Sequence, residues 1–412
     1  MCIRDSIRRY LVVKAPHEEC NEDLEEEEDS SVSQTSTVAY GQEPFEFFRI
    51  RVAELCATIF PRATCRIEHL RGGGYNRITA IAVTPLPPRA FTVPWIHSFL
   101  TSDEDYVKAY TPKHHILRSA RREPSSDDLD MRYDVATLTF ARTNFGIVVP
   151  PVIHLGEHPR NPLSRTYTIQ SRLPGQNLNK IWPELSINQR MNTVHIVVHV
   201  MEKLHIIQQP KAGIIASLTR LPYSPNKVTP EIQAFETSHG PVSAFSGPAD
   251  RPAEAMTTRQ FLVHQRYRWE KLEEDLDDGD IAPWYCFDII IQTLYDKGFI
   301  PDEEKFYFCH LDLYPRNMLV EIEHDSSLSL TGLLDWDAQF AHFCPKFVAY
   351  RAPFWLWVSR GHEYNEMIAA DEPRDVGYRR LKTLWEEAAG DEWKRYAYKP
   401  EYMIARRMFT LL

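Results

Sequence analysis

Residues 306–341 read FYFCHLDLYPRNMLVEIEHDSSLSLTGLLDWDAQFA, and this stretch carries the clearest chemical pattern in the chain. An apolar run that predicts a strand leads into HLDLYPRN, and the runs MLVEIE and LSLTGLLDW then flank the turn HDSS. His310, Asp312 and Asn317 follow the first run, and Asp335 ends the last one. The stretch therefore predicts a strand, a polar loop and a hairpin, with carboxylates where apolar strands end.

Two carboxylates and a carboxamide that converge at strand ends suit a phosphoryl transferase. One carboxylate can accept the proton of the attacking hydroxyl, while an Asp and an Asn can hold magnesium, which selects hard oxygen ligands. The alternative is that Asp312 and Asp335 only turn or cap the chain beside buried strands. The catalytic interpretation is favoured, because carboxylates at the ends of two apolar strands are costly without a purpose.

Composition excludes several classes of protein. The chain has 412 residues, of which 43% are hydrophobic, 25% charged and 12% aromatic, and these proportions exclude fibrous and fully disordered proteins. Its length suits two to three domains or one large domain of two lobes with a cleft. The net charge of -10 comes almost entirely from nine carboxylates between Glu18 and Asp29. A nearly neutral body predicts no nucleic-acid partner and no membrane-surface partner.

The expected location is the cytoplasm. No run of apolar residues is long enough for a membrane span, and the N-terminus lacks the plan of a signal peptide. The seven cysteines are odd in number and scattered, with no CxxC spacing. Such usage indicates reduced thiols and argues against a disulfide framework or a zinc site.

Residues 1–43 are expected to form a disordered acidic tail, because they combine the carboxylate block with few large apolar side chains. The opening MCIRDS, residues 1–6, also resembles a translated sequencing adapter. From Glu43 onward, apolar residues at steps of three and four predict a helix that ends before Pro61, and strands are expected at 65–70, 77–83 and 114–119.

The middle of the chain predicts a change of lobe. Residues 127–145 indicate a helix, 148–155 and 167–171 indicate strands, and LPG at 173–175 indicates a break. The predicted N-terminal, nucleotide-binding lobe therefore covers 44–173, and the catalytic and substrate lobe covers 174–412. In the second lobe, helices are expected at 187–208, 258–277 and 283–298, whereas the Pro-, Gly- and Ser-rich residues 209–257 are expected to be a surface excursion.

Several motifs of the chain resemble the aminoglycoside phosphotransferase and choline kinase-like family, in particular its fungal-type branch. The resemblance runs from about Glu43 to Trp357, through EPFEFF, RGGGYNRI, HILRSAR, LPGQNL, HLDLYPRNMLV, LLDWD and CPKFVAYRAPFWLW. It implies a protein-kinase-like α+β fold of two lobes: a small N-terminal lobe with an antiparallel sheet, and a larger, mainly helical C-terminal lobe. By this resemblance Asp312 is the catalytic base, Asn317 and Asp335 are the magnesium ligands, and His310 organises the catalytic loop.

The N-terminal half offers candidate nucleotide contacts. Gly72, Gly73 and Gly74 lie between two predicted strands and suit a loop whose backbone N–H groups approach phosphates, although a plain hairpin turn would look the same. A kinase-like site also needs a cation on the third strand and an acid on the next helix, for which Arg118 and Asp134 are the candidates. They replace the Lys and Glu of protein kinases, and Arg118 could equally be a surface cation.

The last candidate is the segment before the lobe break. Gln170 and Arg172 lie there, and their backbone is expected to contact adenine, unless the segment is an ordinary linker. Taken together, the sequence predicts ATP- and Mg²⁺-dependent transfer of a phosphoryl group to a hydroxyl of a small molecule. The alternative is a catalytically idle kinase-like fold that binds a nucleotide or another ligand. The acceptor cannot be predicted from the sequence.

Overall fold

The computed structural model describes residues 42–70, 76–86, 110–121, 131–221, 224–235, 248–275, 284–359, 361–362 and 365–412. The predicted tail therefore lies almost wholly outside the described residues, and the three glycines at 72–74 lie outside them as well. The chain divides into two compact units. The described part of the N-terminal unit comes from residues 42–135 and 150–172, and the described part of the C-terminal unit comes from residues 136–149 and 173–412.

The N-terminal unit consists of one helix on a five-stranded antiparallel sheet of order β1-β2-β3-β5-β4. The strands are β1 (Ala63–His69), β2 (Asn76–Pro85), β3 (Lys113–Ala120), β4 (Val152–Gly156) and β5 (Tyr167–Ser171). Helix α3 (Phe45–Ile59) places Phe48, Val52 and Leu55 in one buried cluster with Leu117 and Ile169 of the sheet. The spacing of three and four residues puts these side chains on one helical face, as expected.

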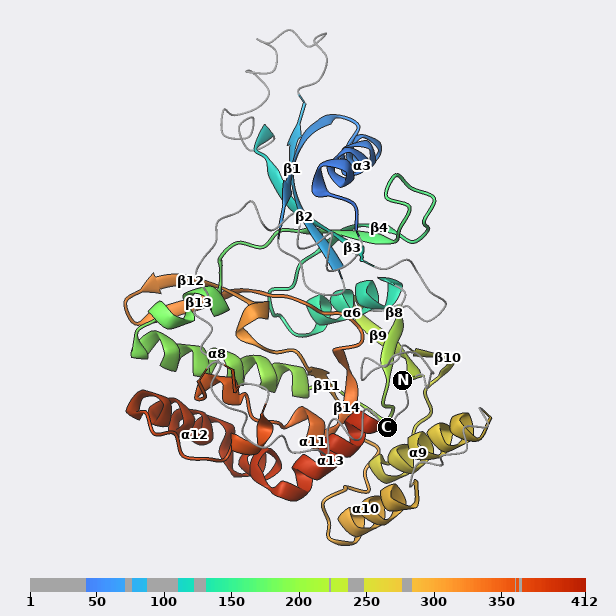
Figure 1. The fold of residues 1–412 in the computed structure, drawn as a ribbon, viewed down its shortest axis with the longest axis vertical. Helices are drawn as coiled ribbons and strands as arrows, with labels where there is room; N and C mark the ends of the chain where they lie inside the picture. The colour runs from blue at the N-terminus through green and yellow to red at the C-terminus, as the bar shows by residue number, and fades with distance from the viewer. Residues whose placement is uncertain are drawn as a thin grey trace. The chain divides into compact units, whose positions relative to one another are not determined.

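The C-terminal unit is mainly helical. It contains α8 (Ile187–His205), α9 (Thr258–Asp275), α10 (Trp284–Asp296), α12 (Val376–Tyr398) and α13 (Pro400–Leu411), the short helices α7 (Leu178–Ile181) and α11 (Lys346–Ala349), and the end of α6 (Met131–Asn144) (Figure 1). Helix α8 begins at a capping box in which Ser186 and Gln189 satisfy each other's backbone N–H groups. Buried Val194, Val197 and Leu204 give α8 its apolar face.

Two small sheets in the C-terminal unit position the candidate site. Strand β11 (Phe306–His310) pairs with β14 (Ala341–Pro345) and with β7 (Gln208–Gln209), and all five of its residues are buried. Strand β12 (Met318–His324) pairs with β13 (Ser327–Leu333) and with β6 (Gln176–Asn177). The expected strand and hairpin of residues 306–335 are therefore present, whereas β14 was not predicted.

The LPG break requires its glycine. Gly175 has φ +98°, and a Cβ atom there would lie 2.1 Å from Oγ1 of Thr331 and 2.9 Å from the carbonyl oxygen of Val320. A side chain at this position would therefore collide with the hairpin of β12 and β13.

The prediction for residues 209–257 was wrong in part. This region contains a three-stranded sheet of β8 (Ile214–Leu221), β9 (Ser224–Phe235) and β10 (Pro248–Pro252). Ile214 and Ile215 are fully buried, so the sheet contributes to the core of the C-terminal unit. The Pro, Gly and Ser content of the region predicted loops, although its short apolar runs form strands.

The α+β class with an antiparallel sheet in the N-terminal unit and a mainly helical C-terminal unit is confirmed. Phe354, Trp355 and Trp357 are buried, which agrees with a packing role for the aromatic YRAPFWLW segment. None of the described helices combines the length and the apolar character that a membrane crossing requires.

Candidate active site

The loop between β11 and β12 folds into a compact turn. The amide N–H of Tyr314 donates to the carbonyl of Asp312 over 2.8 Å, and that of Asn317 donates to the carbonyl of Tyr314 over 2.9 Å. Pro315 starts the 3₁₀ turn Pro315–Asn317, where its fixed φ suits a first position that needs no N–H. The loop therefore presents two polar side chains, at 312 and 317, from one rigid turn.

Asn317 and Asp312 are joined directly. Nδ2 of Asn317 donates to Oδ2 of Asp312 over 2.6 Å and to the main-chain carbonyl of Asp312 over 2.9 Å. The amide nitrogen of Asn317 makes both of these bonds. Oδ1 of Asn317 accepts no hydrogen bond from the residues that the structure describes. The carboxamide oxygen is thus left for another donor or for a cation.

The carboxylate of Asp312 has a second neighbour, because Arg316 also donates to its Oδ1 atom. Burial nevertheless raises the pKa of Asp312, and the negative charge of Asp335 adds to this rise, while Arg316 and Asn317 oppose it. A carboxylate with a raised pKa accepts a proton more readily than an exposed one. Asp312 therefore has the character that a general base needs.

Asp335 follows β13 in an unusual conformation. Its φ of +64° is one of two positive values among the described non-glycine residues. The preceding residue, Leu334, donates its N–H to the carbonyl of Asn317 over 2.8 Å, which fixes the end of β13 against the loop. The negative charge of Asp335 raises the pKa of Asp312, and the bond between Leu334 and Asn317 holds the chain next to Asp335 against the loop.

His310 ties the two strand ends to each other. Its Nε2 atom lies 2.9 Å from the carbonyl oxygen of Leu334 and donates to it, and its ring packs edge-on against Trp336 at 4.8 Å between centroids. Burial lowers the pKa of His310, so the ring is neutral at physiological pH. These contacts suit a residue that positions the loop, and this role of His310 stays a prediction.

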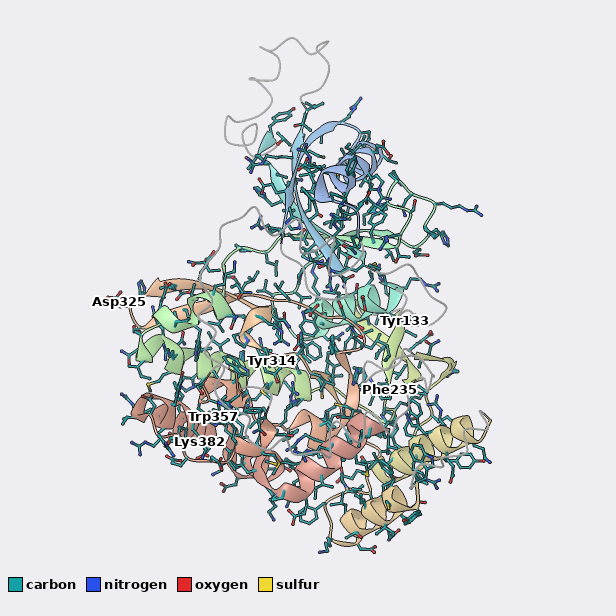
Figure 2. All side chains as sticks on the ribbon, in the orientation of Figure 1. Tyr133, Phe235, Tyr314, Asp325, Trp357 and Lys382 are labelled. Atoms are coloured by element: carbon teal, nitrogen blue, oxygen red, sulfur yellow. The ribbon has the colours of Figure 1, made fainter. Side chains whose placement is uncertain are left out.

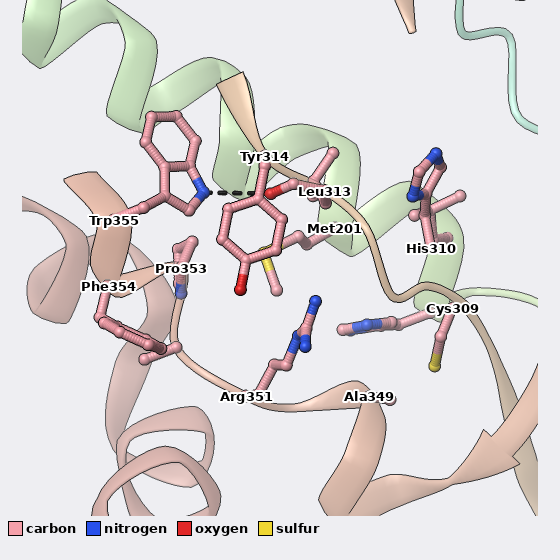
Figure 3. Close-up of a pocket in the computed structure, with 13 residues that line it drawn as sticks. Met201, Cys309, His310, Leu313, Tyr314, Ala349, Arg351, Pro353, Phe354 and Trp355 are labelled. Atoms are coloured by element: carbon pink, nitrogen blue, oxygen red, sulfur yellow. Dashed lines mark hydrogen bonds between the residues drawn. The ribbon is translucent and has the colours of Figure 1, made fainter. Parts of the chain in front are cut away.

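Two further residues hold the loop from its other side, and neither was singled out from the sequence. A terminal nitrogen of Arg351 donates to the carbonyl of Leu311. Nε1 of Trp355 donates to the carbonyl of Leu313 over 3.0 Å, as the dashed line in Figure 3 marks. Both belong to YRAPFWLW, a segment in which the sequence alone indicated no functional residue. Arg316 also went unremarked, although its place four residues after Asp312 allows the ion pair.

The other predicted residues belong to the N-terminal unit. Arg118 lies on β3 between Ile78 and Thr168 and is half-buried, and Asp134 lies in the first turn of α6 and is also half-buried. Gln170 is buried on β5, and the N–H of Arg172 donates to the carbonyl of His114 over 2.9 Å. Their proposed role in nucleotide binding remains a prediction.

The donor set at the loop suits magnesium. Asn317 Oδ1 and the Asp335 carboxylate are hard oxygen ligands, and Mg²⁺ takes such ligands from one or two protein groups while the nucleotide phosphates supply others. Within the described ranges no group of three or more His, Cys, Asp or Glu side chains is arranged to hold a metal ion.

Comparison with solved structures finds distant likenesses. An aminoglycoside phosphotransferase APH(4)-Ia, solved as a ternary complex with AMP-PNP and hygromycin B, is 14% identical with a TM-score of 0.43, over 87% of each chain. The GDP complex of aminoglycoside 2'-phosphotransferase-IIIa is 11% identical with a TM-score of 0.44, over 90% of this chain and 88% of that one. A putative fructosamine-3-kinase from Thermobifida fusca is 12% identical with a TM-score of 0.39, over 84% and 87%.

Comparison with curated proteins gives no match. A family model does match, and its description is Phosphotransferase enzyme family. The matched residues are 100–340, which is more than half of the chain and includes the whole loop and hairpin described above. The chain therefore belongs to the phosphotransferase enzyme family.

Proposed function

We propose that the protein is a small-molecule kinase of the cytoplasm, which uses ATP and Mg²⁺ to phosphorylate a hydroxyl group. The observation that carries the proposal is the direct hydrogen bond between Asn317 and Asp312, with Asp335 beside them. This arrangement places a proton acceptor and one oxygen ligand on the loop between β11 and β12, and a second oxygen ligand at the end of β13. Membership of the phosphotransferase enzyme family supports phosphoryl transfer as the type of reaction.

In the proposed reaction, Asp312 accepts the proton of the acceptor hydroxyl. The hydroxyl oxygen forms a bond to the γ-phosphorus as the bond from that phosphorus to the leaving oxygen of ADP breaks. Asn317 and Asp335 would hold Mg²⁺, which supplies neutralisation of phosphate charge when it is bound. His310 keeps the loop and the end of β13 in register through the carbonyl of Leu334.

Nucleotide contacts are proposed for the N-terminal unit. Gly72, Gly73 and Gly74 would approach the phosphates, Arg118 with Asp134 would orient them, and the backbone of Gln170 and Arg172 would contact adenine. Arg offers a fixed fork of donors where Lys offers a point charge, and Asp is shorter than Glu. This pair is the reason to keep an idle nucleotide-binding module as the second candidate.

Melting curves test the metal and nucleotide assignment. Mg²⁺ with ATP should raise the melting temperature, whereas ATP with a chelator should raise it much less, and Asp335→Asn with Mg²⁺ and ATP should behave like the chelated wild type. Equal shifts under all conditions would remove the magnesium assignment. A normal shift without phosphate release from ATP would instead favour the idle module.

A further inference from the structure

Four arginines gather in the N-terminal unit, on the face of the sheet that α3 covers. Ile81 and Val83 of β2 belong to the apolar cluster under α3, and Arg77 points to the same face because side chains alternate along a strand. The guanidinium carbon of Arg77 lies 4.0 Å from the centre of the Phe48 ring. That of Arg51 lies 5.8 Å from the same point, so both arginines share one aromatic ring of α3.

The other two arginines lie beside the same end of β2. Arg77 is paired across the strands with Ser119, and Arg121 follows two residues later. Nη1 of Arg121 donates to Oε1 of Gln42 over 3.0 Å, just before α3 begins. Arg165 donates to the main-chain carbonyl of Arg121. Arg51, Arg77, Arg121 and Arg165 are called the arginine cluster below.

Arg77 is a buried cation without a hydrogen-bonding partner. Only 5% of its surface is exposed, and among the described residues none accepts a hydrogen bond from it and no carboxylate pairs with it. Its Nε atom is fully covered, whereas its two terminal nitrogens keep some contact with solvent. Burial lowers the pKa of Arg77 to about 10, with a contribution from the positive charges of the other three arginines. At neutral pH this side chain is therefore charged and repelled by its neighbours.

An anion at the terminal nitrogens of Arg77 would relieve this arrangement. A buried charge without a partner is costly, and a hydrogen-bonded anion removes that cost. The Phe48 ring offsets part of it, but it accepts none of the guanidinium N–H groups in an ordinary hydrogen bond. The hydroxyl of Ser119, opposite Arg77, is also buried without a partner within the described ranges. The position thus combines a planar fork of donors with a second unused donor.

The charge of the cluster favours a phosphate-type oxyanion over a carboxylate. Arg51 already pairs with a carboxylate, that of Glu43, and Arg77 is still left without an anion. A tetrahedral dianion carries twice the charge of a carboxylate and offers oxygens in several directions. Arginine binds such oxyanions with two parallel hydrogen bonds.

The arginine cluster is separate from the residues proposed to bind ATP. Arg118 directly precedes Ser119 on β3, and successive side chains of a strand point to opposite faces of a sheet. Arg118 therefore faces away from α3, whereas Arg77 and Ser119 face towards it. An anion held by Arg77 is not a phosphate of a nucleotide bound beside Arg118.

We propose that the arginine cluster is a binding site for a phosphate-type oxyanion, either inorganic phosphate or the phosphate group of a small molecule. The terminal nitrogens of Arg77 hold the anion, and the other three arginines supply the surrounding positive charge. This site goes beyond the proposed kinase function and does not depend on it.

Calorimetry with inorganic phosphate, without nucleotide or Mg²⁺, tests the site. Chloride keeps the ionic strength constant throughout the titration. Wild type should bind phosphate more tightly than acetate, which carries one charge. A dissociation constant for phosphate weaker than about 1 mM, or equal affinity for acetate, overturns the proposal.

Variants test the location of the bound phosphate. Arg77→Gln should weaken binding about ten- to hundredfold, the usual range for hydrogen bonds to a charged group. Arg77→Lys should retain part of the affinity, because the charge remains without the fork. Arg49→Gln on α3 is the matched control, since Arg49 is exposed and pairs with Glu46 over 3.1 Å, and it should leave the affinity unchanged. Unchanged affinity in Arg77→Gln overturns the proposal.

A variant on the other face of the sheet excludes the nucleotide site. Arg118→Gln should leave phosphate affinity unchanged, because its side chain points away from the arginine cluster. Phosphate binding that is lost in Arg118→Gln and kept in Arg77→Gln would place the anion among the residues proposed to bind ATP, and would overturn the inference.

A measurement on the unaltered protein guards against a folding defect in Arg77→Gln. Crystals of wild type are soaked in selenate, a tetrahedral dianion whose selenium atom is located by anomalous scattering. A selenium peak is expected next to the terminal nitrogens of Arg77. Water alone at these nitrogens, or selenate only elsewhere on the protein, overturns the proposal.

The chain itself offers another source of anions, the nine carboxylates between Glu18 and Asp29. In a full-length variant in which all nine are replaced by amides, phosphate affinity should equal that of wild type. A clear gain in affinity would mean that these carboxylates occupy the arginine cluster, and would overturn the assignment of a free oxyanion.

The inference and the proposed function can fail separately. If Mg²⁺ with ATP raises the melting temperature but phosphate does not bind through Arg77, the oxyanion site is overturned while the kinase proposal stands. If phosphate binds through Arg77 but ATP does not bind, the kinase proposal fails and the oxyanion site stands.

Discussion

Asn317 is anchored to Asp312 twice, once through the Asp312 side chain at 2.6 Å and once through its main-chain carbonyl at 2.9 Å. The second bond does not depend on the identity of the side chain at 312. Removal of the carboxylate should therefore leave Asn317 close to its present place. The base and the metal ligand can thus be separated by mutation, although they touch.

Asp312→Ala should keep the Mg²⁺- and ATP-dependent rise in melting temperature and lose turnover. We expect the rate of phosphate release to fall by about 10² to 10⁴, the usual contribution of general acid–base catalysis. Purified wild type and variant are compared at equal saturation with Mg²⁺ and ATP. Matching rates would show that Asp312 is not the base, and loss of the melting shift would show that it also holds the nucleotide or metal.

Asp312→Asn should stabilise the protein without ligand at neutral pH. Burial raises the pKa of Asp312, so the folded state holds the ionised carboxylate less readily than the unfolded chain does. Below pH 3.8, the ordinary pKa, the carboxyl group is protonated in both the folded and the unfolded state, and its burial then costs no charge. As the pH rises through the raised pKa of the folded state, the group ionises and the free energy of unfolding falls. The variant's gain in melting temperature should therefore be largest near neutral pH and shrink on acidification.

The control for that experiment is Asp325→Asn. Asp325 is exposed at the tip of the hairpin of β12 and β13, as Figure 2 shows. Its replacement should give no gain that varies with pH. A similar pH-dependent gain in both variants would mean that net charge, and not burial of Asp312, is responsible.

Two buried histidines should make the fold sensitive to acid. Burial lowers the pKa of His205 to about 3 and that of His342 to about 4, from the ordinary 6.5. Both are neutral in the folded state, so the unfolded chain takes up more protons below pH 6.5 and stability falls as the pH falls from there. Each histidine should contribute at most about 1.4 kcal/mol per pH unit to this loss.

His205→Phe should flatten the pH dependence of the unfolding free energy over the range from 6.5 down to about 4. The aromatic replacement keeps a ring against Tyr350, whose centroid lies 4.8 Å from that of His205. His195→Phe, at an exposed position of the same helix, is the control and should leave the slope as it is. Equal slopes in wild type and His205→Phe would contradict the prediction.

Glu366→Gln should destabilise the C-terminal unit by about 3 kcal/mol, the lower end of the usual cost of breaking a buried ion pair. Glu366 lies 2.7 Å from Nε of Arg406, whose side chain is only 7% exposed. Arg406 keeps its bonds to the carbonyls of Phe347, Tyr396 and Ala397, which limits the loss. Denaturant unfolding measures the change.

Asp391→Asn is the matched control for the ion pair. Asp391 pairs with Lys394 over 2.8 Å but its side chain is 99% exposed, so solvent screens the interaction. The control should unfold like wild type. If Glu366→Gln were equally harmless, Arg406 would be held by its carbonyl bonds alone.

The loop chemistry was predictable because its signals are local. His310, Asp312 and Asn317 lie within eight positions of one another, and Asp335 directly follows an apolar run. Such residues are brought together by a single hairpin, without information from the rest of the chain. The helix at Phe45–Ile59 was predictable for the same reason, since its apolar period is complete in the sequence.

The features that were missed depend on contacts between distant residues. Strand β14 is only five residues long, and its partner β11 ends about thirty residues earlier in the chain. No local sequence pattern therefore indicates that the two strands pair. Arg351 reaches the carbonyl of Leu311 across forty positions, and nothing in YRAPFWLW distinguishes this arginine from a surface cation. The sheet at Ile214–Pro252 was not predicted, because its short apolar runs lie in a region whose Pro, Gly and Ser content is typical of loops.

The left-handed backbone at Asp335 decides how this position can be studied by mutation. Alanine scanning assumes that truncation removes a side chain and leaves the main-chain conformation undisturbed. Alanine at φ +64°, however, is destabilised by about 1 to 2 kcal/mol relative to the right-handed conformation. An inactive Asp335→Ala protein would thus report a mixture of a lost ligand and a disturbed strand end. Asparagine tolerates this conformation and glycine adopts it freely, so these two substitutions, used as a pair, separate chemistry from conformation.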